Sequence, residues 1–242
     1  MDILLLNPNT SLEMTRHIVR EARQHVPGDV TIVPATARFG GAVIASRVSY
    51  AIAAHAGLDA YVQYHGRVDV VVVACFGDPG LEALRELASV PVVGLLESSV
   101  ASAAFHQEPF AIITAGAAWV PMLGERMLSM PHADLARGIF AVDTTGLDIT
   151  RNPAAFTDMM QSAVDDATRA GARTIILGGS ALSGFGGRLR ASVRLIDPLA
   201  AAMAQAVQAG LASEAPRAPP VPGIAYHGVS RELASLLAGH AV

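Results

Sequence analysis

Residues 69–80 read DVVVVACFGDPG, and this stretch decides the fold class of the 242-residue chain. The apolar run VVVVA after Asp69 is typical of a strand buried on both faces, as strands of parallel sheets are. Glycine and proline then end the strand, and Asp78-Pro79 offers an N-cap followed by proline at the first helical position. The stretch therefore predicts a buried parallel strand, a turn at Cys75, and a helix of about 79–88.

The same rhythm extends along the chain in both directions. Apolar runs predict further strands near 2–6, 30–34, 91–96, 109–113, 138–142, 173–177 and 193–196. A capping box of Thr10 and Glu13 predicts a helix that ends near Gln24, and Asp197-Pro198 predicts another over about 198–212. Helices are also expected over about 43–65 and 230–239. This alternation predicts a parallel α/β protein that binds ligands at the carboxyl ends of its strands.

A weak internal repeat relates the two halves at an offset of roughly 102–107 residues. ILLLNPNTS (3–11) matches FAIITAGAA (110–118), VDVVVVACFGDPG (68–80) matches ARTIILGGSALSG (172–184), and PVVGLLESSV (91–100) matches VRLIDPLAAA (193–202). On this alignment Asn7 corresponds to Thr114, and Cys75 corresponds to Gly179 or Ser180. We therefore expect two similar parallel-sheet lobes that face each other across a cleft lined by corresponding loops.

The lobe boundaries follow from the repeat. We expect a first α/β lobe of residues 1–98 plus about 205–242, and a second lobe of residues 99–204. The segment SEAPRAPPVPG at 213–223 holds four prolines and is expected to be a surface linker.

Composition excludes several classes of protein. All 17 basic residues are arginine, so Schiff-base, pyridoxal-phosphate and P-loop chemistry, which need a lysine amine, are excluded. The single cysteine cannot form an internal disulfide or a cysteine zinc site, and the eight histidines show no ligand spacing on one helix face. We expect neither a metal nor any other cofactor.

Charge and hydropathy bear on partners and location. The net charge is −4 and no basic block is present, so nucleic acid is not an expected partner. Uncharged stretches are shorter than a membrane span, and the N-terminus lacks the basic start of a signal peptide. We expect a cytoplasmic homo-oligomer that acts on a small molecule.

Cys75 is the principal candidate for chemistry. Backbone amides and the helix dipole at the predicted start of the 79–88 helix are expected to lower the pKa of its thiol. A lone cysteine is also often only a small buried apolar residue. In the same way, the loop from Asn7 to Ser11 can be read as one that only caps a helix, and Thr114 as a residue that only satisfies local backbone groups after a strand. Asp78 and Asp197 are interpreted as helix caps.

Five segments together resemble the aspartate/glutamate/hydantoin racemase superfamily, with its hydantoin and allantoin racemase branch as the nearest match. They are NPNTS (7–11), ACFGDPGLEALRE (74–86), PVVGLLESS (91–99), AIIT (111–114) and ILGGSALSG (176–184). The resemblance implies two pseudosymmetric parallel α/β lobes with an active site between them and no cofactor.

The resemblance also implies roles for individual residues. In this family two cysteines flank the acidic carbon of the substrate, and Cys75 matches the first of them. The substrate's carboxylate or ring groups are then expected to bind Asn7, the Phe76-Gly77 backbone and Thr114. The loop from Phe39 to Ile44 resembles the segment that covers the substrate.

The second cysteine of the family is missing. This chain has Gly179 where the family typically has cysteine, with Ser180 next to it, and an unperturbed serine hydroxyl is too weak an acid to replace a thiol. A single base reaches one face of a carbon, so one-sided isomerisation, proton exchange or decarboxylation is the leading expectation. Two alternatives stay open: Cys75 as the nucleophile of a cis-trans isomerase, and a binding protein without activity.

Overall fold

The computed structural model describes residues 1–212 and 225–238, so the expected linker at 213–223 lies outside the described residues. The first half of the chain forms a parallel sheet with the strand order β2-β1-β3-β4. These strands are β1 (Asp2–Asn7), β2 (Thr31–Thr36), β3 (Val70–Val73) and β4 (Val92–Gly94).

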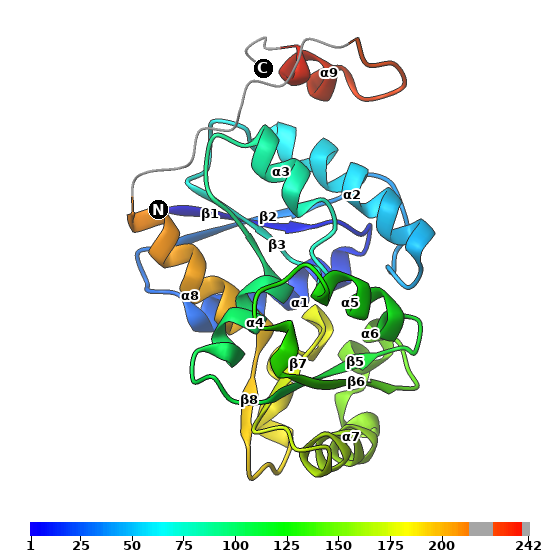
Figure 1. Ribbon diagram of the computed structural model, residues 1–242. Helices are drawn as coiled ribbons and strands as arrows, with labels where there is room; N and C mark the ends of the chain where they lie inside the picture. Colours follow the sequence, from blue (N-terminus) through cyan, green and yellow to red (C-terminus); the bar gives the residue numbers. More distant parts are fainter. Residues whose placement is uncertain (213–224, 239–242) are drawn as a thin grey trace.

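A second parallel sheet repeats this topology with the order β6-β5-β7-β8. Its strands are β5 (Phe110–Ala115), β6 (Ala136–Val142), β7 (Thr174–Leu177) and β8 (Arg194–Ile196). Figure 1 shows the two sheets in separate lobes, the first in blue to cyan and the second in green to yellow. The predicted α/β class, the predicted strands and the two-lobed architecture are confirmed.

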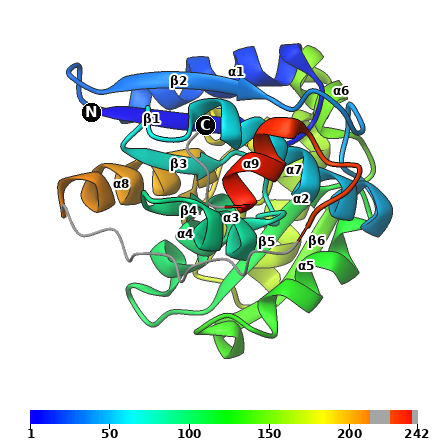
Figure 2. The ribbon, with the colours of Figure 1, turned by 90° about the horizontal axis from the view of Figure 1, so that it is seen from above.

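Helices connect the strands and cover the sheets. They are α1 (Leu12–Ala22), α2 (Arg47–Tyr61), α3 (Leu81–Leu87), α4 (Leu95–Ala104), α5 (Trp119–Met127), α6 (Gly146–Arg151), α7 (Thr157–Arg169), α8 (Pro198–Leu211) and α9 (Arg231–Leu237). After the second lobe, α8 returns to pack against α1, α4 and β3, and α9 packs against α2 on the far side of the first sheet (Figures 1 and 2). In the part of the chain that is described, no helix has the length and apolar character to cross a membrane.

Two of the predicted helix starts are wrong. Ser11, not Thr10, caps α1, because its side chain accepts the Met14 N–H while the Thr10 N–H donates to the Gly41 carbonyl. Asp78 does not cap α3, which begins after Gly80 without a side-chain cap. The third prediction is confirmed, because Asp197 accepts the first amide groups of α8.

One apolar core runs through both lobes. It includes Leu5 and Val72 of the first sheet together with Phe110 and Ile176 of the second, and all four side chains are fully buried. The lobes therefore share this core, and each lobe also has an apolar cluster of its own on the other face of its sheet. The exact boundaries at 98/99 and 204/205 stay a prediction.

Candidate active site

Cys75 lies in a tight turn at the carboxyl end of β3. The Ala74 N–H donates to the Leu6 carbonyl at 2.8 Å, the Cys75 N–H donates to the Val73 carbonyl at 2.9 Å, and the Asp78 N–H donates to the Cys75 carbonyl at 3.0 Å. These bonds fix the backbone on both sides of the sulfur. The side chain packs with Ile44, Ala53, Tyr50 and Trp119 and is only 8% exposed.

The second lobe builds the same turn at the end of β7, without a side chain at its tip. The Gly178 N–H donates to the Ile113 carbonyl at 2.6 Å, the Gly179 N–H to the Leu177 carbonyl at 2.8 Å, and the Leu182 N–H to the Gly179 carbonyl at 2.9 Å. This pattern of bonds matches Cys75 with Gly179, not with Ser180. It also matches Leu6 with Ile113, and hence Asn7 with Thr114.

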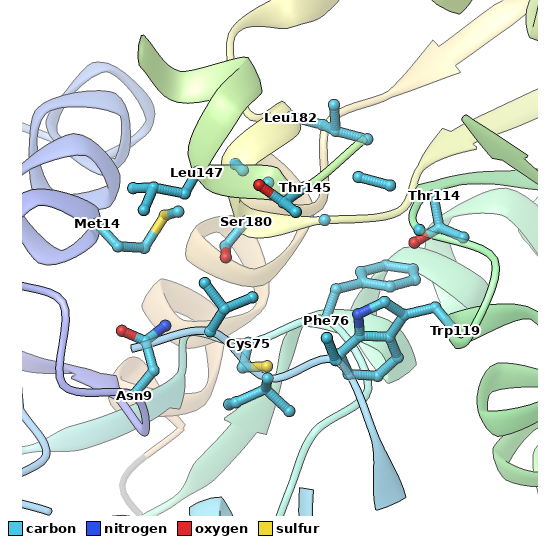
Figure 3. A pocket seen from close by; sticks show the side chains of 18 of the residues that line it. Asn9, Met14, Cys75, Phe76, Thr114, Trp119, Thr145, Leu147, Ser180 and Leu182 are labelled. Atoms are coloured by element: carbon cyan, nitrogen blue, oxygen red, sulfur yellow. The ribbon is translucent and has the colours of Figure 1, made fainter. Parts of the chain in front are cut away.

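A pocket of about 140 Å³ lies between the two turns. Figure 3 shows Cys75 on one wall, with Ser180 and Thr145 on the opposite wall and Thr114 and Trp119 to one side. Of the residues predicted from the sequence, six line this pocket: Ile44, Cys75, Phe76, Thr114, Gly179 and Ser180. The cleft between the lobes is therefore present, and corresponding loops line it.

Asn7 and Gly77, the other two predicted binding residues, do not line the pocket. Asn7 is fully buried, and its amide donates to Asn9 Oδ1 at 3.0 Å and to Thr15 Oγ1 at 2.9 Å. The side-chain oxygen Oδ1 of Asn7 accepts the Asn9 N–H, so Asn7 shapes the loop that presents Asn9 to the pocket. The Gly77 carbonyl accepts the Tyr50 hydroxyl.

Several lining residues were not predicted from the sequence: Asn9, Met14, Trp119, Thr144, Thr145 and Leu147. Thr144 and Thr145 follow the end of β6, so the rule that ligands bind at the carboxyl ends of parallel strands could have found them. Trp119 is the only tryptophan of the chain. Met14 lies within the amphipathic α1, and the sequence pattern does not distinguish it from the residues of α1 that pack in the core.

The expectation of a lowered thiol pKa is wrong. Burial raises the pKa of the Cys75 thiol above its ordinary value, and the nearby Asp78 carboxylate adds to the effect. The physical reason is that α3 begins only at Leu81, so Cys75 does not lie at a helix N-terminus. The resting side chain is therefore the protonated thiol.

Asp78 is a fully buried carboxyl group behind the Cys75 turn. It accepts the N–H groups of Leu96 and Glu97 at 3.0 Å, so it caps α4 and not α3. Burial raises its pKa to about 7, and the two amide donors only partly oppose this effect. Gly94 leaves room for the carboxyl, because a Cβ there would lie 2.3 Å from Asp78 Oδ2.

The pocket offers uncharged polar groups and one thiol. Cys75 is the sole ionisable side chain among the described residues that line it. Within residues 1–212 and 225–238, no cluster of three histidine, cysteine or acidic side chains that could hold a metal is found. The groups at hand thus suit proton transfer by the thiol and hydrogen bonding by Asn9, Thr114, Thr145 and Ser180.

A two-lobed parallel α/β fold with a thiol in the cleft defines a class of racemase-like proteins, and comparison with known proteins agrees. The family model Asp/Glu/Hydantoin racemase matches residues 3–206. The chain belongs to this Asp/Glu/hydantoin racemase family.

Several of the relatives are hydantoin or allantoin racemases. A hydantoin racemase of Rhizobium meliloti is 31% identical over 216 residues, which cover 85% of this chain and 87% of that one. A hydantoin racemase of Pseudomonas sp. (strain NS671) is 31% identical over 76% of this chain and 75% of its own. The solved allantoin racemase of Klebsiella pneumoniae has a TM-score of 0.80 at 26% identity and covers 98% of both chains.

Proposed function

We propose that this chain is a cofactor-independent enzyme that transfers a proton at an acidic carbon next to a carbonyl group, with Cys75 as both acid and base. The observation that carries the proposal is the position of Cys75, the one ionisable group among the described pocket residues, at the tip of the β3 turn. The Cys75 thiol first gives its proton to water, and the thiolate then takes the proton from the carbon. The resulting thiol exchanges this proton with the solvent and returns a solvent proton to the same face of the carbon.

The lining favours a neutral ring over a dicarboxylate as substrate. No cationic side chain is among the described residues of the pocket, and burying a carboxylate without a charged partner is costly. Amide and hydroxyl groups of Asn9, Thr114 and Ser180 match the carbonyl and N–H groups of a hydantoin-like ring. The hydantoin racemases among the relatives support the same substrate class.

The opposite wall limits the reaction to one face. Gly179 occupies the position that corresponds to Cys75, and it has no group that can donate or accept a proton. We therefore propose stereospecific proton exchange or isomerisation at the Cys75 face, without rapid interconversion of enantiomers.

Proton exchange into deuterated water tests the proposal. Both enantiomers of 5-benzylhydantoin, and of allantoin, are incubated with wild type and with Cys75→Ala, and deuterium uptake is followed by mass spectrometry against an enzyme-free blank. Wild type should exchange one enantiomer, and Cys75→Ala should be at least about 100-fold slower. No uptake for any substrate, or equal uptake in both proteins, would overturn the proposal.

Two further assays distinguish the alternative functions. A covalent adduct on Cys75 after incubation with an unsaturated dicarboxylate would favour a nucleophilic isomerase. Calorimetric binding of hydantoins without any exchange would favour a binding protein. The proposal predicts neither result.

A further inference from the structure

A tyrosine from α2, which lies earlier in the chain, holds the turn that carries Cys75. Tyr50 lies in the first turn of α2, and its hydroxyl donates to the Gly77 carbonyl at 2.7 Å. Gly77 is two residues beyond Cys75 in the same turn. The hydrogen bond thus ties the turn that carries the sulfur to α2, which directly follows the pocket loop of residues 42–45.

Trp119 of the second lobe presses on the same peptide from another side. A Cβ on Gly77 would lie 2.7 Å from Trp119 Cζ3, so the indole ring occupies the space above the glycine. Gly77 also has a φ of +127°, which other residues rarely adopt. The Tyr50 and Trp119 rings meet edge to face, with centroids 6.4 Å apart and an interplanar angle of 77°.

We infer that Tyr50 and Trp119 are positioning residues that clamp the Gly77 peptide and thereby hold the Cys75 sulfur in place for proton transfer. This inference rests on the proposed function, because it gives the sulfur its role. Neither residue exchanges a proton with the substrate; Trp119 also lines the pocket.

The Tyr50 phenol is suited to act as a permanent donor. Burial raises its pKa to about 12, with Arg126 opposing and Cys75, Asp78 and Glu82 adding to the shift. The hydroxyl therefore stays protonated, and keeps its bond to the Gly77 carbonyl, over the whole pH range in which the enzyme would be assayed.

Alkylation of the thiol tests the clamp without any substrate. Cys75 is the only cysteine of the chain, so uptake of iodoacetamide by the native protein reports on this sulfur alone. The test variant is Tyr50→Phe, which removes the hydroxyl and keeps the ring. The matched control is Tyr64→Phe, because Tyr64 likewise donates to a backbone carbonyl, that of Pro34, away from the pocket.

With Tyr50→Phe we expect alkylation at pH 8.5 to be about tenfold faster than in wild type. We expect kcat for deuterium exchange to be about tenfold lower, with KM within about twofold, as loss of one partly buried hydrogen bond allows. In Tyr64→Phe the alkylation rate and kcat should both stay within about twofold of wild type. Trp119→Phe, which shrinks the ring over Gly77, should also speed alkylation and serves as the test if Tyr50→Phe does not fold.

The outcomes separate the clamp from the proposed function. Alkylation and kcat in Tyr50→Phe that match Tyr64→Phe would overturn the clamp while leaving the proposed function intact. Faster alkylation in Tyr50→Phe, in a protein whose wild type exchanges no substrate, would support the clamp and overturn the proposed function.

Discussion

At the scale of single residues, the two glycines that follow β7, Gly178 and Gly179, differ in whether packing requires glycine. A Cβ on Gly178 would lie 2.6 Å from Ile112 Cγ2 and 2.8 Å from Phe76 Cε1, so packing requires glycine there. A Cβ on Gly179 would lie 3.5 Å from Leu182 Cγ, an ordinary contact, and its φ of 177° is extended backbone open to any residue. Packing therefore does not require a glycine at position 179, opposite Cys75.

Restoring a thiol at this position should add the second face of the reaction. We expect Gly179→Cys to fold, because the space is open, and to interconvert the enantiomers of a hydantoin at least about 100-fold faster than wild type. Chiral chromatography of the reaction measures the rate. Gly179→Ser, which fills the same space with a weak acid, is the control and should show no gain; equal rates in the two variants would contradict the two-thiol explanation.

The pH dependence of exchange should follow the raised pKa of the Cys75 thiol. The thiolate is the base, so kcat/KM for deuterium uptake should increase with pH and reach no plateau below the ordinary thiol pKa of 9.0. Rates at each pH are corrected for exchange in Cys75→Ala. A plateau near neutral pH would show that the pocket stabilises the thiolate, contrary to the burial described above.

Cys75, Thr114 and Gly179 could be placed in the site from the sequence because each lies at or just beyond the carboxyl end of a central strand. The choice between Asn7 and Asn9 could not be made in this way, since it depends on which amide the loop turns inward. Trp119 was missed because it reaches Gly77 from the other lobe, a contact without a local sequence signal.

At the scale of secondary structure elements, the same Asp-Pro pattern has two outcomes. Asp197 caps the helix that follows it, through bonds two and three residues away. Asp78 instead reaches α4, 18 and 19 residues along the chain, because α4 points its N-terminus at the Cys75 turn and Gly94 leaves space for the carboxyl. Sequence patterns can predict helix caps from neighbouring residues, but they do not predict caps from residues far away in the chain.

Stability should depend on pH through Asp78. Folding raises its pKa from 3.8 to about 7, so its contribution is fully present below about pH 4 and is lost as pH rises through 7. Asp78→Asn cannot ionise. Between pH 5 and pH 8 the difference in unfolding free energy should therefore shift in favour of the variant by more than about 1 kcal/mol.

Urea titrations of wild type and Asp78→Asn at pH 5, 6.5 and 8 measure this shift. A difference in unfolding free energy that stays the same at all three pH values would reflect packing or hydrogen bonding only. That result would contradict the raised pKa of Asp78.

At the scale of the whole molecule, the internal repeat predicted two similar parallel-sheet lobes and the pairing of Cys75 with Gly179 or Ser180. The shared strand order and the choice of Gly179 come from the structure. The repeat could not predict how tightly the lobes join, which depends on side chains from both. The shared apolar core is one link. Exposed ion pairs also cross between the lobes: Arg47 with Glu125, Glu82 with Arg126, and Glu13 with Arg151.

The shared core should make the two lobes unfold together. Trp119, the only tryptophan, lies where the lobes meet, and far-UV circular dichroism reports on both sheets. We expect urea transitions followed by tryptophan fluorescence and by circular dichroism to coincide. A fluorescence transition at clearly lower urea concentration would instead mean that the lobes separate first.

The central claim is that a single thiol acts on one face of the substrate carbon. The most direct test compares two rates in one reaction of wild type with enantiopure 5-benzylhydantoin in deuterated water: uptake of deuterium, and loss of enantiomeric purity, each corrected for the enzyme-free blank. We predict that one enantiomer takes up deuterium to completion while it keeps its configuration. Racemisation that keeps pace with deuterium uptake would contradict the claim.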